Sequence, residues 1–307
     1  MQNVPFNFNI LKASSMVIAT LFLVSLAPAQ KTPLASPPII FAVLNDGKLV
    51  EPIASVSGGK LVEPDLGSSD ASPSKVFGER YYKPRSLYPI VFGGALDGAL
   101  TITRSNLGSE CGGATAEVVS RPIKAKLARF VMALATNVKL SARSTGYRRR
   151  PTPEERSEVE SLVREEFRKK GAKAVAMRVL RYHNLTSIDV NGDGIPEFVG
   201  SYWIAPTAKL RMQIFFIAAQ NASEKLEMVY NDSEVIKPDD VMTGDLKDLD
   251  DGRGSELLLD ALDYDDDGVK EIFTIGQGFE GNNYYVYKLI DGKWTKTFET
   301  YRYYCAY

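Results

Sequence analysis

Two short acidic loops carry oxygen-bearing residues at the same spacing, the arrangement by which proteins bind hard cations. In each loop, side-chain oxygens stand at positions 1, 3, 5 and 9, glycine stands at position 6, and position 7 offers its backbone carbonyl. The first loop places Asp189, Asn191, Asp193, Ile195 and Glu197 at these ligand positions, and the second places Asp263, Asp265, Asp267, Val269 and Glu271. Calcium takes roughly six to eight oxygens, so the pattern predicts calcium as the cofactor of both loops.

The residues that follow distinguish these loops from an EF-hand. An EF-hand needs a bidentate glutamate at position 12, and that position is Gly200 in the first loop and Thr274 in the second. Gly194 and Gly268 stand where the chain must turn toward positive φ, which costs other residues about 1 to 2 kcal/mol. Aromatic and β-branched residues come after position 9, so we expect each loop to lead into a strand.

In this respect the chain resembles the FG-GAP or VCBS type of calcium-binding repeat, in which Asp-x-Asp/Asn-x-Asp-Gly-x-x-Asp/Glu precedes a hydrophobic strand. The resemblance covers roughly residues 184–307 and implies an antiparallel module of propeller-blade type with calcium loops. A propeller typically needs about four or more blades, which two loops cannot supply. We therefore expect either an open fragment that packs on the rest of the chain or a smaller sheet unit built from the same hairpins.

A degenerate third copy lies between Asp248 and Glu256. It keeps the acidic residues at positions 1, 3 and 9, but Gly252 replaces the third carboxylate. An acidic turn is the favoured interpretation of this segment, and a third metal loop is the alternative.

The first residues have the pattern of an export signal. Lys12 precedes an apolar run from Met16 to Leu26, and Ala27-Pro28-Ala29 offers a small-residue cleavage pattern. The run is shorter than the roughly 20 apolar residues that span a membrane. The pattern predicts a signal peptide at residues 1–29, with an uncleaved anchor as the alternative. It predicts a secreted, periplasmic or cell-surface protein without a transmembrane segment once the signal is removed.

Two cysteines, Cys111 and Cys305, form an even count in a chain with an export signal. One disulfide between them is the favoured prediction, and two unpaired thiols are the alternative.

Hydrophobic patterning predicts a mainly β protein with a helical connector, an α+β organisation. After a linker at residues 30–38, short strand patterns at 39–140 indicate a small N-terminal β domain. A basic linker at 141–151 and a helical connector at 152–183 lead to the calcium-loop module at 184–307. Thr152, Pro153 and Glu155 have the spacing of a capping box with proline in the first turn, and Gly171 is placed to end that helix.

The C-terminal strands show two further patterns. Leu210, Met212, Ile214 and Phe216 alternate along one segment, which predicts a strand with one buried face. Aromatic residues gather between Tyr284 and Tyr307, and cross-strand packing is favoured for them over an exposed binding platform.

Catalytic combinations are scarce in this sequence. The single histidine, His183, has no Gly-x-Ser-x-Gly elbow to serve, so a structural histidine is favoured. The triplet from Arg148 to Arg150 is interpreted as a solvated linker and not as a nucleic-acid site, because the formal net charge is −1.

The favoured function is therefore a non-catalytic exported protein whose calcium-stabilised module binds an unknown protein or glycan. The alternative is a calcium-dependent secreted polysaccharide hydrolase or lyase, in which spare acids such as Asp239, Asp240 and Glu280 transfer protons.

Overall fold

The computed structural model describes residues 36–66, 72–107, 114–140 and 146–304, all of which belong to the compact unit Ser36–Tyr307. The predicted signal peptide, Cys111 and Cys305 lie outside the described residues, so the structure leaves these predictions untested. Strands dominate the described chain and every paired strand is antiparallel, which confirms the mainly β prediction.

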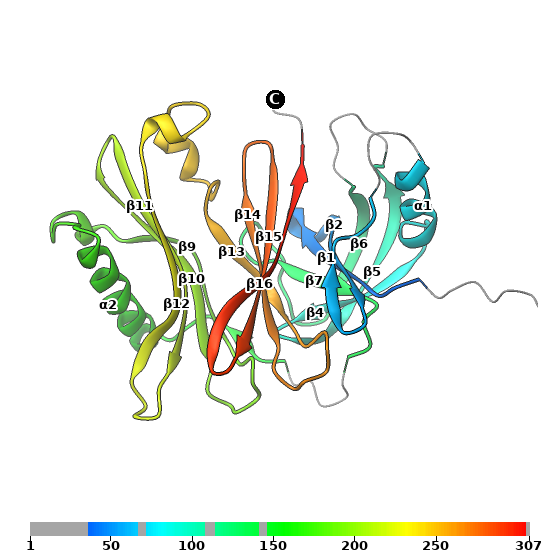
Figure 1. The fold of residues 1–307 in the computed structure, drawn as a ribbon, viewed down its shortest axis with the longest axis horizontal. Coiled ribbons are helices and arrows are strands. Elements are labelled where there is room, and N and C mark those ends of the chain that lie inside the picture. The colour runs from blue at the N-terminus through cyan, green and yellow to red at the C-terminus, as the bar shows by residue number, and fades with distance from the viewer. Residues whose placement is uncertain (1–35, 67–71, 108–113, 141–145, 305–307) are drawn as a thin grey trace, which may run out of the picture. The chain divides into compact units, whose positions relative to one another are not determined.

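The N-terminal part is a closed six-stranded sheet, hereafter the barrel. Strand β1 pairs with β7 on one side and with β2 on the other, so no open edge remains between the first and last strands. Around the barrel the strands are β1 (Ile39–Leu44), β7 (Ala133–Thr136), β4 (Leu87–Phe92), β5 (Ala95–Ser105), β6 (Ala116–Pro122) and β2 (Leu49–Ser57). Three short elements are attached to the barrel: β3 (Lys60–Val62), η1 (Asn45–Gly47) and α1 (Ser72–Tyr81) (Figure 1).

Two four-stranded meanders follow, and each is an antiparallel sheet in chain order. The first sheet contains β9 (Arg181–Ile188), β10 (Glu197–Thr207), β11 (Leu210–Gln220) and β12 (Leu226–Ile236), and the two-residue β8 (Arg148–Arg149) pairs with the end of β9. The second sheet contains β13 (Glu256–Leu262), β14 (Glu271–Gln277), β15 (Gly281–Ile290) and β16 (Lys293–Tyr303). The 3-10 turns η3 (Pro238–Asp240) and η4 (Leu246–Leu249) lie between the two sheets in the chain.

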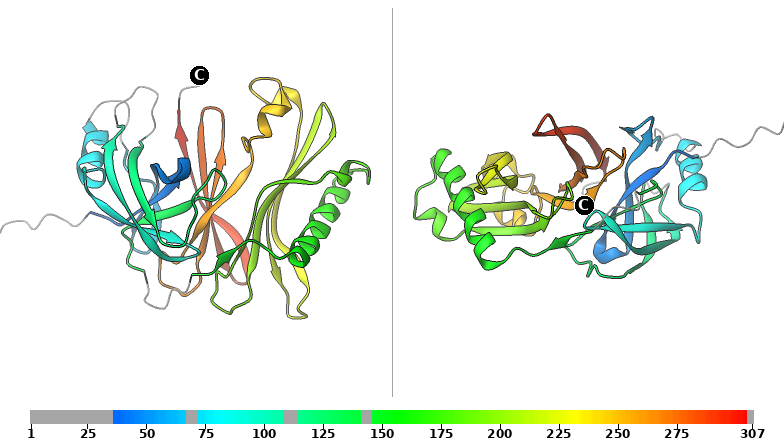
Figure 2. Two further views of the ribbon diagram at one scale, coloured as in Figure 1. Left: turned by 180° about the vertical axis from the view of Figure 1, so that it is seen from behind. Right: turned by 90° about the horizontal axis from the view of Figure 1, so that it is seen from below.

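These units pack as successive layers. Helix α2 (Pro153–Lys169) packs through Val163 and Phe167 on one face of the first sheet, around Phe216. The opposite face of the first sheet packs on the second sheet, where Phe215 stacks on Tyr287. The other face of the second sheet joins the wall of the barrel in a further apolar cluster. Figures 1 and 2 show the second sheet between the first sheet and the barrel.

The start of α2 confirms the capping box. Thr152 Oγ1 accepts a hydrogen bond from the Glu155 amide at 3.2 Å, and Glu155 Oε2 accepts one from the Thr152 amide at 2.7 Å. Gly171 adopts a φ of +88° just beyond the helix, as expected for its C-terminal turn. Beyond Gly171, the helical connector predicted at 152–183 contains only η2 (Ala176–Arg178), and β9 begins at Arg181.

The prediction of one buried face on the strand around Leu210 is wrong. In β11, Met212, Ile214 and Phe216 contact the α2 layer, while Phe215 and Ile217 contact the second sheet. A central strand between two packed layers buries both faces, which the alternation of Arg211 and Gln213 with apolar residues conceals.

The solvated-linker interpretation of the basic triplet is wrong for Arg148. Its guanidinium donates to Asp260 Oδ2 at 2.6 Å and to the carbonyls of Met132 and Leu259, and both charged side chains are almost completely buried. The Asp260 carboxylate also accepts from the amides of Gly93 and Gly94 at 3.0 and 2.9 Å. This group of bonds connects β8, β13 and the β4–β5 turn of the barrel.

We expect Arg148→Met or Asp260→Asn to lower the free energy of unfolding by about 3 to 5 kcal/mol, because each leaves a buried charge without its partner. The double variant should cost less than the sum of the two single changes. Urea unfolding followed by tryptophan fluorescence measures both quantities. Arg149→Met is the matched control, since its half-exposed pair with Glu155 should contribute less than about 1 kcal/mol. If the double variant lost as much free energy of unfolding as the sum of the two single variants, Arg148 and Asp260 would not be coupled.

Candidate metal centre

The two acidic loops occupy the same place in the two meanders. Each joins the first strand of its sheet to the second, and position 9 pairs with the last residue of the preceding strand in both sheets: Glu197 with Ile188, and Glu271 with Leu262. Both loops lead into strands, as predicted, so the shared spacing in the sequence corresponds to a shared position in the fold.

The loops also share three hydrogen bonds. The position 6 amide donates to the position 1 carboxylate at 3.1 Å in the first loop and 3.0 Å in the second. The position 7 amide donates to the position 5 carboxylate at 2.7 and 2.9 Å. The position 2 amide donates to the position 9 glutamate at 3.1 and 3.4 Å. Both position 6 glycines have positive φ, +83° and +94°, as the turn requires.

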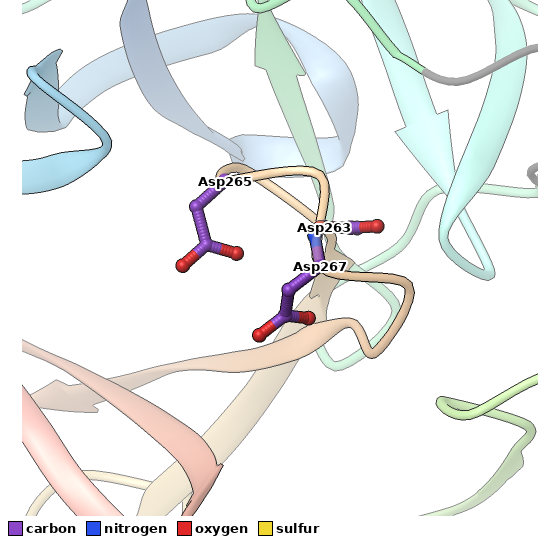
Figure 3. A group of neighbouring side chains, drawn as sticks. All are labelled: Asp263, Asp265 and Asp267. Atoms are coloured by element: carbon purple, nitrogen blue, oxygen red, sulfur yellow. Dashed lines mark hydrogen bonds between the residues drawn. The ribbon is translucent and has the colours of Figure 1, made fainter.

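Three carboxylates of the second loop converge on one point. Carboxylate oxygens of Asp263, Asp265 and Asp267 lie within 4.8 Å of one another, and Figure 3 shows these side chains projecting from one loop. Asp265 Oδ1 is buried without a hydrogen-bond partner, so an acceptor is left over for a cation. The set contains only oxygen atoms, which fits calcium.

The two position 9 glutamates lie beneath the loops. Glu197 and Glu271 are buried, and burial is the main cause that raises the pKa of each to about 7. Neighbouring loop aspartates add to the shift in both cases. These carboxyls therefore sit where an added positive charge would be stabilising.

A lysine distinguishes the second loop from the first. The Lys288 ammonium, from β15, donates to Asp265, Asp267 and Glu271 at 2.8, 2.7 and 2.6 Å. The residue after position 9 pairs with the next strand in both sheets: Ile272 with Tyr287, and Phe198 with Ala218. Lys288 follows Tyr287, so its equivalent in the first sheet is Ala219, which follows Ala218. Within the described residues, no lysine or arginine forms an ion pair with the first loop's acids. The carboxylates of the second loop thus have a lysine partner, and those of the first loop have none among the described residues.

The two loops are in direct contact through Lys270. Its backbone amide donates to the Val190 carbonyl at 2.9 Å, and its buried ammonium donates to the Asp189 carbonyl at 3.1 Å. Both hydrogen bonds join Lys270 of the second loop to backbone carbonyls of the first.

The degenerate third copy is an acidic turn, the interpretation that the sequence favoured. Its first residues form η4, and the segment connects the two sheets instead of closing a hairpin. Asp250 pairs with Arg211 at 2.9 Å and Asp251 pairs with Arg129 at 2.8 Å. Arg211 thus neutralises Asp250, one of the three acids at ligand positions, whereas Asp251 stands at position 4 of the loop.

The C-terminal aromatic residues serve mainly as core. Tyr284, Tyr287 and Trp294 are buried between layers, whereas Tyr301 and Tyr303 remain exposed on β16. Asp239, Asp240 and Glu280, the acids predicted to transfer protons, do not line the polar pocket between the two sheets. The Asp240 carboxylate accepts a hydrogen bond from the Lys237 amide as a local cap.

A polar pocket that the sequence did not indicate lies between the two sheets. It has a volume of about 330 Å³, and Asp232, Glu234 and Glu256 line it together with Tyr285. Burial raises the pKa of Glu256 to about 7, and the charge of Asp232 adds to this shift. These acids come from β12 and β13, and no local motif relates residues on separate strands.

No family model matches this chain, and comparisons with curated proteins and with solved structures find no match. None of the helices in the described residues has the length and apolar character needed to cross a membrane.

His183 is a partnered structural residue. Its ring lies near Phe130 and Trp203, and Arg211 donates to its Nε2 at 3.1 Å, so that nitrogen must be the unprotonated acceptor of a neutral ring. Burial is the main cause that lowers the pKa of His183 to about 4, and the Arg211 charge acts in the same direction.

We expect His183 to make the protein acid-sensitive. The unfolded histidine takes up a proton near pH 6.5, whereas the folded residue does so near pH 4. The stabilisation is therefore complete above pH 6.5 and is lost as the pH falls to 4, by at most about 3 kcal/mol. Urea unfolding at pH 7 and pH 4.5 should show a larger acid-induced loss in the wild type than in His183→Gln. Equal losses in both proteins would refute this role.

Proposed function

We propose that this protein is an exported, non-catalytic binding protein whose two-sheet module is ordered by calcium in the two acidic loops. The observation that carries the proposal is the repetition of one loop, with one register and three equivalent hydrogen bonds, in two successive sheets. The resemblance to FG-GAP or VCBS repeats supports the choice of calcium, and the export signal predicted at residues 1–29 supports an extracellular or cell-surface setting.

Calcium would act on the fold through the charges of the loops. Asp189, Asn191, Asp193 and Glu197 would hold the ion in the first loop, together with the Ile195 carbonyl. Asp263, Asp265, Asp267 and Glu271 would hold it in the second, together with the Val269 carbonyl. An ion bound in each loop would offset carboxylate repulsion above the apolar cluster that joins the two sheets. At a concentration a thousand times its Kd, each ion would stabilise the folded state by about 4 kcal/mol.

We expect protein freed of metal with a chelator to bind calcium and to gain several degrees in Tm. Asp189→Asn and Asp263→Asn should each weaken one site, because each removes a ligand charge while keeping a side-chain acceptor for the glycine amide. Isothermal titration calorimetry gives the number of sites, and thermal melts give the stabilisation. Asp239→Asn is the control, an exposed aspartate on η3 far from the loop motifs in the chain. Identical melts with calcium and with chelator would overturn the proposal.

We expect the two loops to differ in affinity because calcium must displace Lys288 from the second. Lys288→Met should strengthen binding at the second loop by at least about tenfold, equivalent to about 1.4 kcal/mol. The same variant should be less stable than the wild type in chelator, since three carboxylates lose their counter-charge. Titration calorimetry and melts in both buffers test this, with exposed Lys293→Met as the control. An unchanged second affinity would show that the lysine does not compete.

A second candidate function, polysaccharide cleavage, is favoured by one specific observation. Glu256 lies in the polar pocket with a pKa raised to about 7, and Asp232 and Glu234 share that pocket. A protonated acid beside an ionised one is the arrangement that glycoside hydrolysis requires. Calcium-dependent release of reducing ends from a polysaccharide would establish this function, whereas binding without products would support the first proposal.

A further inference from the structure

A basic groove lies between the barrel and the open edge of the first sheet. Its volume is about 810 Å³, and it is lined by the segment between β6 and β7, by the chain leaving β8, and by β9. Seven of its lining side chains are lysine or arginine, and none is acidic. None of the calcium-loop residues lines it, so this site is separate from the proposed metal centre.

Part of this positive charge is unpaired. Arg129, Arg148, Arg149 and Arg156 have carboxylate partners in ion pairs. The remaining basic residues are exposed and have no ion-pair partner within the described residues; they are Lys124, Lys126 and Arg150. The groove therefore attracts a ligand that carries negative charge.

The wall of the same groove contains a strand edge that no other strand pairs with. Strand β8 covers only Ser187 and Ile188 of β9 before the chain leaves at Pro151. From Arg181 to Thr186, no described strand pairs with this edge of β9. The Asp189 amide donates to the Tyr147 carbonyl on this side, so Ser187 and Leu185 direct their backbone groups the same way, as far as the register shift at His183.

A polar side chain at the groove wall also lacks a partner. Asn184 is 5% exposed, and both polar atoms of its amide are buried without a hydrogen bond. A buried amide in this state is costly unless a donor or acceptor reaches it.

We propose that the groove binds an acidic protein segment in an extended conformation, which adds a strand to the open edge of β9 while its carboxylates meet Lys124, Lys126 and Arg150. The free backbone edge favours a peptide over other polyanions, because only a peptide offers alternating N–H and C=O groups at strand spacing. The basic side chains select acidic residues in that peptide, and the pairing fixes its direction along β9.

The test uses a fluorescent eight-residue peptide of alternating Glu and Val, titrated with the full-length protein and followed by anisotropy. Lys124→Glu together with Lys126→Glu should weaken binding by at least about tenfold, since both charges are reversed at the groove. Lys60→Glu together with Lys293→Glu changes the net charge equally away from the groove and should leave binding unchanged. Circular dichroism verifies that each variant is folded.

A second peptide separates strand addition from general attraction between charges. N-methylation at alternate residues keeps the charge but removes the amide donors that a strand edge needs, and it should abolish binding. Equal binding of the methylated peptide, no binding of the parent peptide, or no effect of the groove charges would overturn the proposal. Tighter binding of a sulfated polysaccharide or an oligonucleotide would also overturn it.

Repeating the titration with the Asp189→Asn, Asp263→Asn variant distinguishes this inference from the proposed calcium function. Peptide binding should persist when the folded variant no longer takes up calcium. Loss of peptide binding in that folded variant would overturn the separation of the two sites.

Discussion

The buried pairing of Arg148 with Asp260 is the interaction on which the arrangement of the β units depends. Arg148 belongs to the first sheet, Asp260 to the second, and the amides that complete the carboxylate's hydrogen bonds come from Gly93 and Gly94 of the barrel. A charge removed from water needs its partners in place, so all three units must meet in one register. Gly94 has a φ of +77°, and a Cβ there would come within 2.5 Å of the Lys270 side chain, so both the backbone and the packing favour glycine.

This packing also brings the two acidic loops together. The first and second sheets bury apolar faces against each other, and Lys270 then reaches from one loop to the backbone of the other. The backbone geometry of the loops is the same, but their charge balance is not, because β15 carries Lys288 where β11 carries Ala219. Duplication of the loop spacing therefore does not imply duplication of the charges around it.

Charge is separated on the protein although the formal net charge is only −1. Acidic groups gather in the two loops and in the pocket between the sheets, whereas basic groups gather in the groove beside the barrel. The separation matters because burial and local charge, and not net charge, determine which ions or ligands a surface attracts. An average over the chain conceals both regions.

Local sequence determined the features that depend on neighbouring residues: the capping box at Thr152, the positive φ of Gly194 and Gly268, and the strands that follow the acidic loops. These follow from backbone sterics and hydrogen bonds within a few residues. Only the tertiary structure decided that Arg148 is buried, that Lys288 reaches the second loop, and that Glu256 shares a pocket with Asp232. Lys288 and Glu271 are 17 positions apart in the chain, and Arg148 and Asp260 are 112 positions apart. Periodicity within one segment carries no information about such distant partners, since the packing of whole layers sets them.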